Sequence, residues 1–204
     1  CFVMENGDLF GEEYTLVAVS DYLLGIQPGN TVSNLSSTRA LRDVTEKHGG
    51  KYTASAVGEV NVVDKMKETQ AVIGGEGNGG VIYPELHYGR DALVGVALFI
   101  SLLVERGLSV AALRSTYPSY FMSKNKITLE EGMDVDAILE TIARKYKDEK
   151  ISTIDGVKID FKDEWVHLRK SNTEPIIRIY TEATNEAAAA ALASRFVQEI
   201  KLLF

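Results

Sequence analysis

The sequence predicts an α/β layered domain with a mostly parallel sheet, followed by a smaller α+β domain with an antiparallel sheet. Up to about residue 115, apolar runs of strand length alternate with longer segments whose apolar residues recur at helical spacing, as in a parallel sheet covered by helices. After residue 134, a helical segment, several short apolar runs and a second helical segment follow one another, which indicates an antiparallel sheet with two helices. We place the two domains at residues 1–118 and 119–204.

The elements of the first domain follow from the spacing of its apolar residues and from its glycines. A helix is expected at residues 12–24, with Gly25 in the position of a C-cap. Residues 90–105 are apolar on nearly all sides, so we expect a helix that neighbouring elements cover and that Gly107 ends. The other expected elements are strands at residues 1–4, 30–35, 51–56 and 70–73 and helices at residues 38–48 and 60–67.

Residues 115–128 have no helical period, and we interpret this segment as the linker between the two domains. Asp134 then caps an expected helix that runs to Tyr146. Short apolar runs separated by polar turns predict an antiparallel meander after this helix. Its expected strands are residues 151–154, 157–161, 165–168 and 176–182, and a helix at residues 185–202 closes the chain.

The composition excludes several classes of protein. The net charge of -7 argues against a nucleic-acid partner, because non-specific affinity for nucleic acid comes mostly from Lys and Arg. The longest apolar stretch, residues 92–104, is too short to cross a bilayer, so no membrane partner is expected. Cys1 is the only cysteine, which excludes an intrachain disulfide and a cysteine metal cluster and fits a reducing compartment such as the cytoplasm.

One ten-residue segment has the composition of an anion-binding site. It reads R-K-S-N-T-E-P-I-I-R and runs from Arg169 to Arg178. Guanidinium groups offer a planar fork of donors that matches a phosphate group, and Ser171, Asn172 and Thr173 add short donors on a turn. The alternative is a tight turn flanked by ordinary surface charges, since such residues also dominate turns for local reasons.

A second candidate site is the glycine-rich segment G-G-E-G-N-G-G at residues 74–80, which we expect to follow the strand at residues 70–73 as a loop. So many glycines permit positive φ and close approach of a ligand, at a cost in backbone entropy. Glu76 is its acceptor and Asn78 can both donate and accept, a pair suited to vicinal sugar hydroxyls. The alternatives are a flexible surface loop and a dinucleotide-binding loop. The second fits poorly, because the glycine spacing differs and a carboxylate repels phosphate.

Both segments resemble parts of one enzyme family. The run R-x-S-N-T-E-P-x-x-R, between a strand that contains a tryptophan and a strand followed by an alanine-rich helix, closely resembles the phosphate-binding loop of the α-D-phosphohexomutases. That family includes phosphoglucomutase, phosphomannomutase and phosphoglucosamine mutase. The glycine-rich segment is similar to the family's sugar-specificity loop, usually G-E-x-S-G, with Asn78 where serine is commoner.

A weaker resemblance lies at the V-G pair before Glu59. The family carries a similar turn, and the residue after it faces the substrate, which would give Glu59 a role in sugar binding. An acidic residue favoured by the dipole at a helix N-terminus is the alternative. Asn34, Ser36 and Ser37 lie in a matching strand-to-helix segment, although polar helix caps explain them equally well.

The resemblance implies a four-domain isomerase that moves phosphate between the 1- and 6-positions of a hexose phosphate through a bisphosphate intermediate. A phosphoserine in the first domain and a Mg²⁺ loop of aspartates in the second would carry the chemistry, the third domain would read sugar hydroxyls, and the fourth would hold the non-reacting phosphate. We find neither the phosphoserine loop nor the Mg²⁺ loop here, so we expect the third and fourth domains alone, with no catalytic residue, no bound metal and no activity by themselves. The expected partners are the hexose phosphate and the missing N-terminal domains. The alternative is a stand-alone sugar-phosphate-binding module without catalysis.

Overall fold

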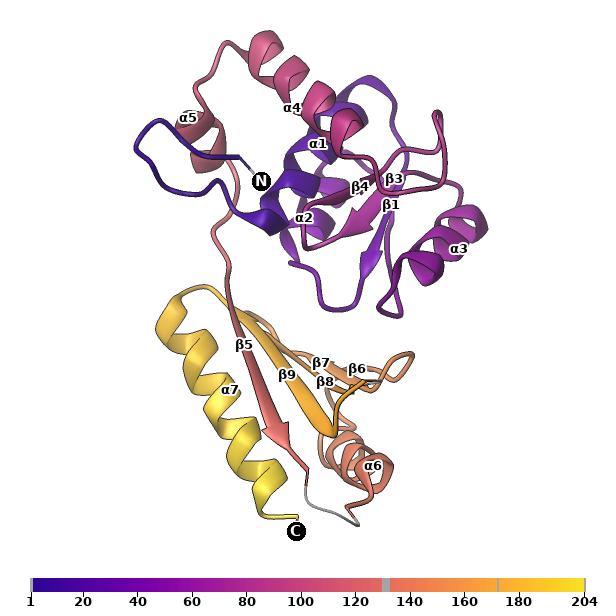
Figure 1. The fold of residues 1–204 in the computed structure, drawn as a ribbon, viewed down its shortest axis with the longest axis vertical. Coiled ribbons are helices and arrows are strands. Elements are labelled where there is room, and N and C mark those ends of the chain that lie inside the picture. The colour runs from indigo at the N-terminus through magenta and orange to yellow at the C-terminus, as the bar shows by residue number, and fades with distance from the viewer. Residues whose placement is uncertain (1, 130–132, 172, 204) are drawn as a thin grey trace. The chain divides into compact units, whose positions relative to one another are not determined.

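Figure 1 shows the computed structural model, which describes residues 2–129, 133–171 and 173–203. The chain divides into two compact units, Cys1–Pro118 and Ser119–Phe204. The first unit contains a mixed, mostly parallel sheet with helices, and the second contains a five-stranded antiparallel sheet with helices. The predicted fold class is therefore confirmed.

The sheet of the first unit brings two strand ends together at one edge. Side by side, its strands are β2 (Tyr52–Ser55), β1 (Asn30–Asn34), β3 (Ala71–Glu76) and β4 (Gly80–Ile82). The first three run parallel, and β4 returns antiparallel to β3 as a hairpin. Because Ser33 lies opposite Gly75, the last residues of β1 and β3, Asn34 and Glu76, are neighbours.

Helices cover both faces of this sheet (Figure 1). They are α1 (Glu12–Ile26), α2 (Ala40–Lys47), α3 (Glu59–Thr69) and α4 (Ala92–Arg106), and the short α5 (Val110–Ser115) follows α4 along the chain. α1 packs against α2, α4 and β3, whereas α3 packs against the three parallel strands. The core between α3 and the sheet consists of Val32, Val62, Val63, Met66, Ala71 and Ile82.

The prediction and the structure differ most at three places in this unit. The expected strand at residues 1–4 is reduced to one isolated bridge between Val3 and Leu9, on either side of a tight turn. Gly25 lies inside α1, which continues to Ile26 and ends with Gln27 in an extended conformation. The strand expected to stop at residue 73 runs on to Glu76, because pairing with β4 extends it.

The expectation that neighbouring elements cover α4 is wrong. Phe99 is buried and its ring lies 4.9 Å from that of Phe10, but Leu93, Ile100 and Val104 are 81%, 53% and 76% exposed. α4 packs with one face against α1 and β4, and within the described chain no element covers its other apolar face. Its end at Gly107 is as expected, with φ of 60° in the left-handed region.

The second unit is an antiparallel sheet with two described helices. Side by side, its strands are β5 (Phe121–Thr128), β9 (Ile176–Ala183), β8 (Trp165–Lys170), β7 (Val157–Asp160) and β6 (Lys150–Ser152). The helices are α6 (Val135–Lys145), which Asp134 caps as expected, and α7 (Glu186–Lys201). Both helices bury their apolar faces in one core with the sheet, through residues that include Ile138, Ile142, Leu192, Phe196 and Ile200.

The interpretation of residues 115–128 as a linker is wrong for residues 121–128, whereas the boundary between the two units lies at residues 118 and 119. Residues 121–128 form β5, which pairs with β9 from Phe121 opposite Ala183 to Thr128 opposite Ile176. β5 lies at the sheet edge and Ile127 is its one buried residue, so the strand lacks the apolar alternation that reveals a strand in sequence.

Across the described chain, no helix combines the length and hydrophobicity needed to span a bilayer.

Candidate functional site

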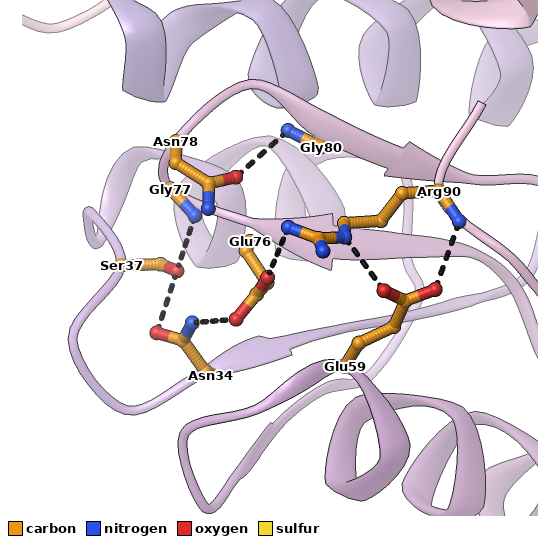
Figure 2. A network of polar contacts seen from close by, with 8 residues as sticks. All are labelled: Asn34, Ser37, Glu59, Glu76, Gly77, Asn78, Gly80 and Arg90. Carbon is orange, nitrogen blue, oxygen red and sulfur yellow. Dashed lines mark hydrogen bonds and ion pairs between the residues drawn. The ribbon is translucent and has the colours of Figure 1, made fainter. Parts of the chain in front are cut away.

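Glu76 lies at the centre of a polar network in the first unit (Figure 2). It ends β3 and is 7% exposed. Asn34, at the end of the neighbouring strand, donates from Nδ2 to Glu76 Oε1 over 3.1 Å. Asn34 Oδ1 in turn accepts from Ser36 N at 3.0 Å and from Ser37 Oγ at 3.1 Å, so the loop after β1 fixes the amide.

Arg90 connects Glu76 to Glu59, as Figure 2 shows. Its Nη1 donates to Glu76 Oε2 over 3.2 Å, and its Nε donates to Glu59 Oε2 over 2.7 Å. The backbone N–H of Arg90 also donates to Glu59 Oε1 over 3.1 Å. These hydrogen bonds, from the backbone first and then the side chain, lower the pKa of the Glu59 carboxyl. Both oxygens of Glu59 are therefore held by a single residue.

The turn that joins β3 to β4 carries Asn78 at its tip. Gly77 N donates to Ser37 Oγ at 3.0 Å, and Gly80 N donates to Asn78 Oδ1 at 3.1 Å. A side chain at residue 77 would meet the carboxylate of Glu13, which would have to move to make room for it. Because Oδ1 is occupied, Asn78 offers its Nδ2 donor to a ligand.

An open pocket of about 570 Å³ lies beside this network. Its lining consists of Glu59, Asn78, Gly79, Gly80, Val81, Arg90, Asp91 and Ala92. Asp91 caps α4 by accepting from Leu93 N at 2.8 Å and Val94 N at 3.0 Å, as expected of a helix cap. The Val94 N–H and the His87 ring lower the pKa of the Asp91 carboxyl. The pocket thus has anionic walls with one guanidinium among them.

The phosphate-binding candidates lie together in the second unit. Arg169 on β8 is directly opposite Arg178 on β9, so two guanidinium side chains emerge from one point of the sheet. Arg169 Nη1 is 3.8 Å from Asp155 Oδ2, and Arg178 Nη2 is 3.2 Å from Glu174 Oε2. The buried Nε of Arg169 has no hydrogen-bond partner among the described residues.

Hydroxyl groups complete this cluster on the connection from β8 to β9. Ser171 is 7% exposed, and its Oγ lies 3.5 Å from both Oγ1 and the backbone N of Thr173. The backbone N–H of Ser171 donates to the carbonyl of Ile176 over 3.0 Å, which closes the connection. Asn172, the remaining candidate, lies outside the described residues.

The turn between β6 and β7 packs against the backbone of β8 at Leu168 and Arg169. Gly156 has φ of 67°, and a Cβ there would meet the carbonyl oxygen of Leu168 and the Cα of Arg169. His167 is 1% exposed, and its Nε2 lies 2.7 Å from the carbonyl oxygen of Asp155. Burial lowers the pKa of His167 to about 4, so the neutral ring donates to this carbonyl near neutral pH.

The structure therefore gathers the predicted residues into two clusters, one in each unit. Asn78 and Glu59 line one pocket, although Glu59 faces Arg90 at close range, and Glu76 lies behind the pocket lining, bonded to Arg90. Sequence reasoning missed Arg90, which lies 31 residues from Glu59 and gives no local pattern beyond the triplet G-R-D. Among the described residues, no group of three His, Cys, Asp or Glu side chains could hold a metal ion, so these residues do not fit a Mg²⁺ site.

Comparisons with known proteins agree with this two-part architecture. The family model described as phosphoglucomutase/phosphomannomutase, alpha/beta/alpha domain III, matches residues 11–120. The model described as the C-terminal domain of phosphoglucomutase/phosphomannomutase matches residues 125–199. Together the two models cover most of the chain.

Individual relatives match the whole chain but extend well beyond it. A protein named probable phosphoglucosamine mutase from Methanopyrus kandleri is 33% identical over 203 residues, which are 98% of this chain and 45% of that protein. A phosphoglucomutase/phosphomannomutase from Thermococcus kodakarensis is 36% identical over 191 residues, 92% of this chain and 41% of its own length. The crystal structure of a phosphoglucomutase/phosphomannomutase family protein from Burkholderia thailandensis matches with a TM-score of 0.81 at 25% identity, over 98% of this chain and 43% of that one. The chain thus spans less than half the length of each.

Proposed function

This chain belongs to the phosphoglucomutase/phosphomannomutase family, and from that premise we propose that it is the substrate-binding half of a phosphohexomutase. In this proposal the first unit reads the hydroxyl groups of a hexose phosphate, and the second unit holds a phosphate group of that ligand. The substrate class comprises glucose, mannose and glucosamine phosphates. We also assign the enzyme to the cytoplasm, because the single cysteine of this chain fits a reducing compartment.

The observation that carries the proposal is the arrangement of Glu76 beside Asn78. Glu76 has one oxygen on Asn34 and the other on Arg90, and an ionised carboxylate retains further lone pairs that can accept from sugar hydroxyls. Asn78 supplies the complementary donor at the pocket wall. A hydroxyl group both donates and accepts, so adjacent hydroxyls of a sugar ring match this acceptor and donor.

The second unit supplies the charge that a phosphate group requires. Arg169 and Arg178 emerge from opposite positions on neighbouring strands, and the hydroxyls of Ser171 and Thr173 lie on the connection between these strands. Charge-assisted hydrogen bonds of this kind contribute about 1.5–3 kcal/mol each. We also assign Asn172 to this phosphate site, from the sequence motif.

In the full-length enzyme, the phosphate would move between the 1- and 6-positions through a bisphosphate intermediate. Positioning and electrostatic stabilisation dominate such chemistry, which is the part that a substrate-binding half can supply. We expect the phosphoserine and the Mg²⁺ ligands to lie in the N-terminal half that the longer relatives possess, and the 204-residue chain to be inactive alone.

Calorimetric titration tests the binding role. We expect glucosamine 6-phosphate to bind the chain more tightly than inorganic phosphate does, because the sugar adds contacts in the first unit. Glu76→Gln should abolish this advantage and leave phosphate affinity unchanged. Equal affinities of the wild-type chain for both ligands would contradict sugar recognition. Mutase turnover by the chain alone would contradict its proposed dependence on an N-terminal half, and absence of turnover by the longest reading frame that contains it would favour a stand-alone binding module.

A further inference from the structure

Arg90 and Glu59 form the outer part of the network around Glu76 (Figure 2). We propose that Arg90 is a positioning residue that fixes the Glu76 carboxylate for sugar binding, and that Glu59 acts on the site only through Arg90. This inference rests on the proposed function for its ligand, and it changes the role expected of Glu59 from a sugar contact to the support of an arginine.

The engagement of Glu59 is the first step. Its two carboxylate oxygens accept from the backbone N–H and from Nε of Arg90, at 3.1 and 2.7 Å. Glu59 begins α3, so its backbone is held by a helix that packs on the sheet. A carboxylate with both oxygens facing one arginine is oriented toward that arginine.

The burial of Glu76 is the second step. Its side chain is 9% exposed, whereas that of Arg90 is 45% exposed. A buried carboxylate without a cation costs several kcal/mol, and within the described chain the ion pair of Glu76 is the one with Arg90. An ordinary exposed ion pair contributes little to stability, so the burial of Glu76 separates this contact from a surface salt bridge.

The geometry of the two donors is the third step. Asn34 holds Oε1 and Arg90 holds Oε2, so the plane of the Glu76 carboxylate is fixed from both sides. Without Arg90, the bond from Asn34 alone would let the carboxylate rotate. The aliphatic part of Arg90 also lies against Gly80, where a Cβ would be 2.7 Å from Arg90 Cδ, so the arginine fills the space that this glycine leaves.

Spectra of the ligand-free chain test the positioning directly. In ¹H–¹⁵N spectra, we expect the Nε–H of Arg90 to exchange slowly with solvent in the wild-type chain and fast in Glu59→Gln. Arg90→Gln and Glu59→Gln should both shift the backbone amides of residues 77–80. The matched control is Glu68→Gln, which removes a carboxylate of the same helix from an exposed pair with Lys65 and should leave these amides unchanged. Unchanged amides at residues 77–80 in Arg90→Gln would overturn the proposal.

Binding measurements then test whether the two residues act in series. We expect Arg90→Gln to weaken glucosamine 6-phosphate binding about tenfold and Glu59→Gln about threefold, with the double variant no weaker than Arg90→Gln alone. Arg90→Lys should restore part of the affinity, because a lysine keeps the charge but not the fork. Multiplying effects in the double variant would show that Glu59 contacts the ligand itself and would overturn the proposal. If the wild-type chain binds no glucosamine 6-phosphate, the proposed function fails, and the ligand-free spectra alone decide the role of Arg90.

Discussion

Gly156→Ala should damage the phosphate site although it replaces none of the residues that we assign to that site. The φ of 67° at this residue costs a non-glycine residue about 1–2 kcal/mol. The new methyl group would also meet the carbonyl oxygen of Leu168 and the Cα of Arg169, backbone atoms that move only if β8 moves, which adds about 1–3 kcal/mol. We therefore expect the second unit to lose about 2–5 kcal/mol of unfolding free energy and phosphate affinity to fall about tenfold.

The chain offers a matched control and a built-in probe for this experiment. Gly107 has a similar φ of 60° but no atom within 4 Å of its Cβ position, so Gly107→Ala carries the backbone strain without the collision. Trp165, the single tryptophan, is fully buried in the second unit, and its fluorescence in denaturant reports unfolding of that unit. Equal losses of unfolding free energy in the two variants, each measured for the unit that carries the substitution, would refute the collision with β8. Unchanged phosphate affinity in Gly156→Ala would refute the claim that this turn supports Arg169.

Three further predictions concern single side chains. Arg169→Ala should weaken phosphate binding by about 1–3 kcal/mol in calorimetric titration with the fold intact, and unchanged affinity would remove it from the site. His167 has a folded-state pKa of about 4, whereas a histidine in the unfolded chain has a pKa of about 6.5. Between these values the unfolded chain binds a proton that the folded chain does not, so the second unit should lose stability as pH falls from about 6.5 to 4. His167→Gln should abolish this loss in denaturation curves. Burial would raise the pKa of Asp21, but the hydrogen bonds from His48 and Arg106 have the larger combined effect and lower it. The contribution of Asp21 to stability is therefore present above the unfolded pKa and lost as pH falls below about 4. Asp21→Asn should flatten this acid limb in the first unit, and an unchanged limb would contradict the assignment.

Local patterns in the sequence predict most of the fold, and contacts distant in sequence account for the errors. The apolar residues locate the long helices and the parallel strands of the first unit, because these elements bury most of their apolar side chains, α1 and the strands β1 and β3 on more than one face. β5 is missed because an edge strand can be polar on most positions, and its identity depends on pairing with β9, about fifty residues later. The exposure of α4 is missed because hydropathy measures a tendency to be buried and carries no information on which partner is present.

The candidate site likewise contains residues that local sequence patterns predict and residues that only tertiary contacts reveal. Glu76 and the glycines around it are visible in sequence, since such a run of glycines is costly unless the backbone needs it. The link from Glu76 through Arg90 to Glu59 joins the end of β3, the segment before α4 and the start of α3. No spacing rule in the sequence connects residues that come together only in the folded domain. The turn at Gly156 that supports Arg169 is hidden for the same reason, because an Asp-Gly pair predicts a turn without showing what lies against it.

The most direct test of the central claim is an NMR titration of the ¹⁵N-labelled chain with glucosamine 6-phosphate. The claim predicts saturable shifts in two groups of backbone amides: residues 77–80 in the first unit, and Ser171 with Thr173 in the second. Inorganic phosphate should shift only the second group. Shifts confined to the second group with both ligands would contradict sugar recognition by Glu76 and Asn78, and would leave the chain with an anion site alone.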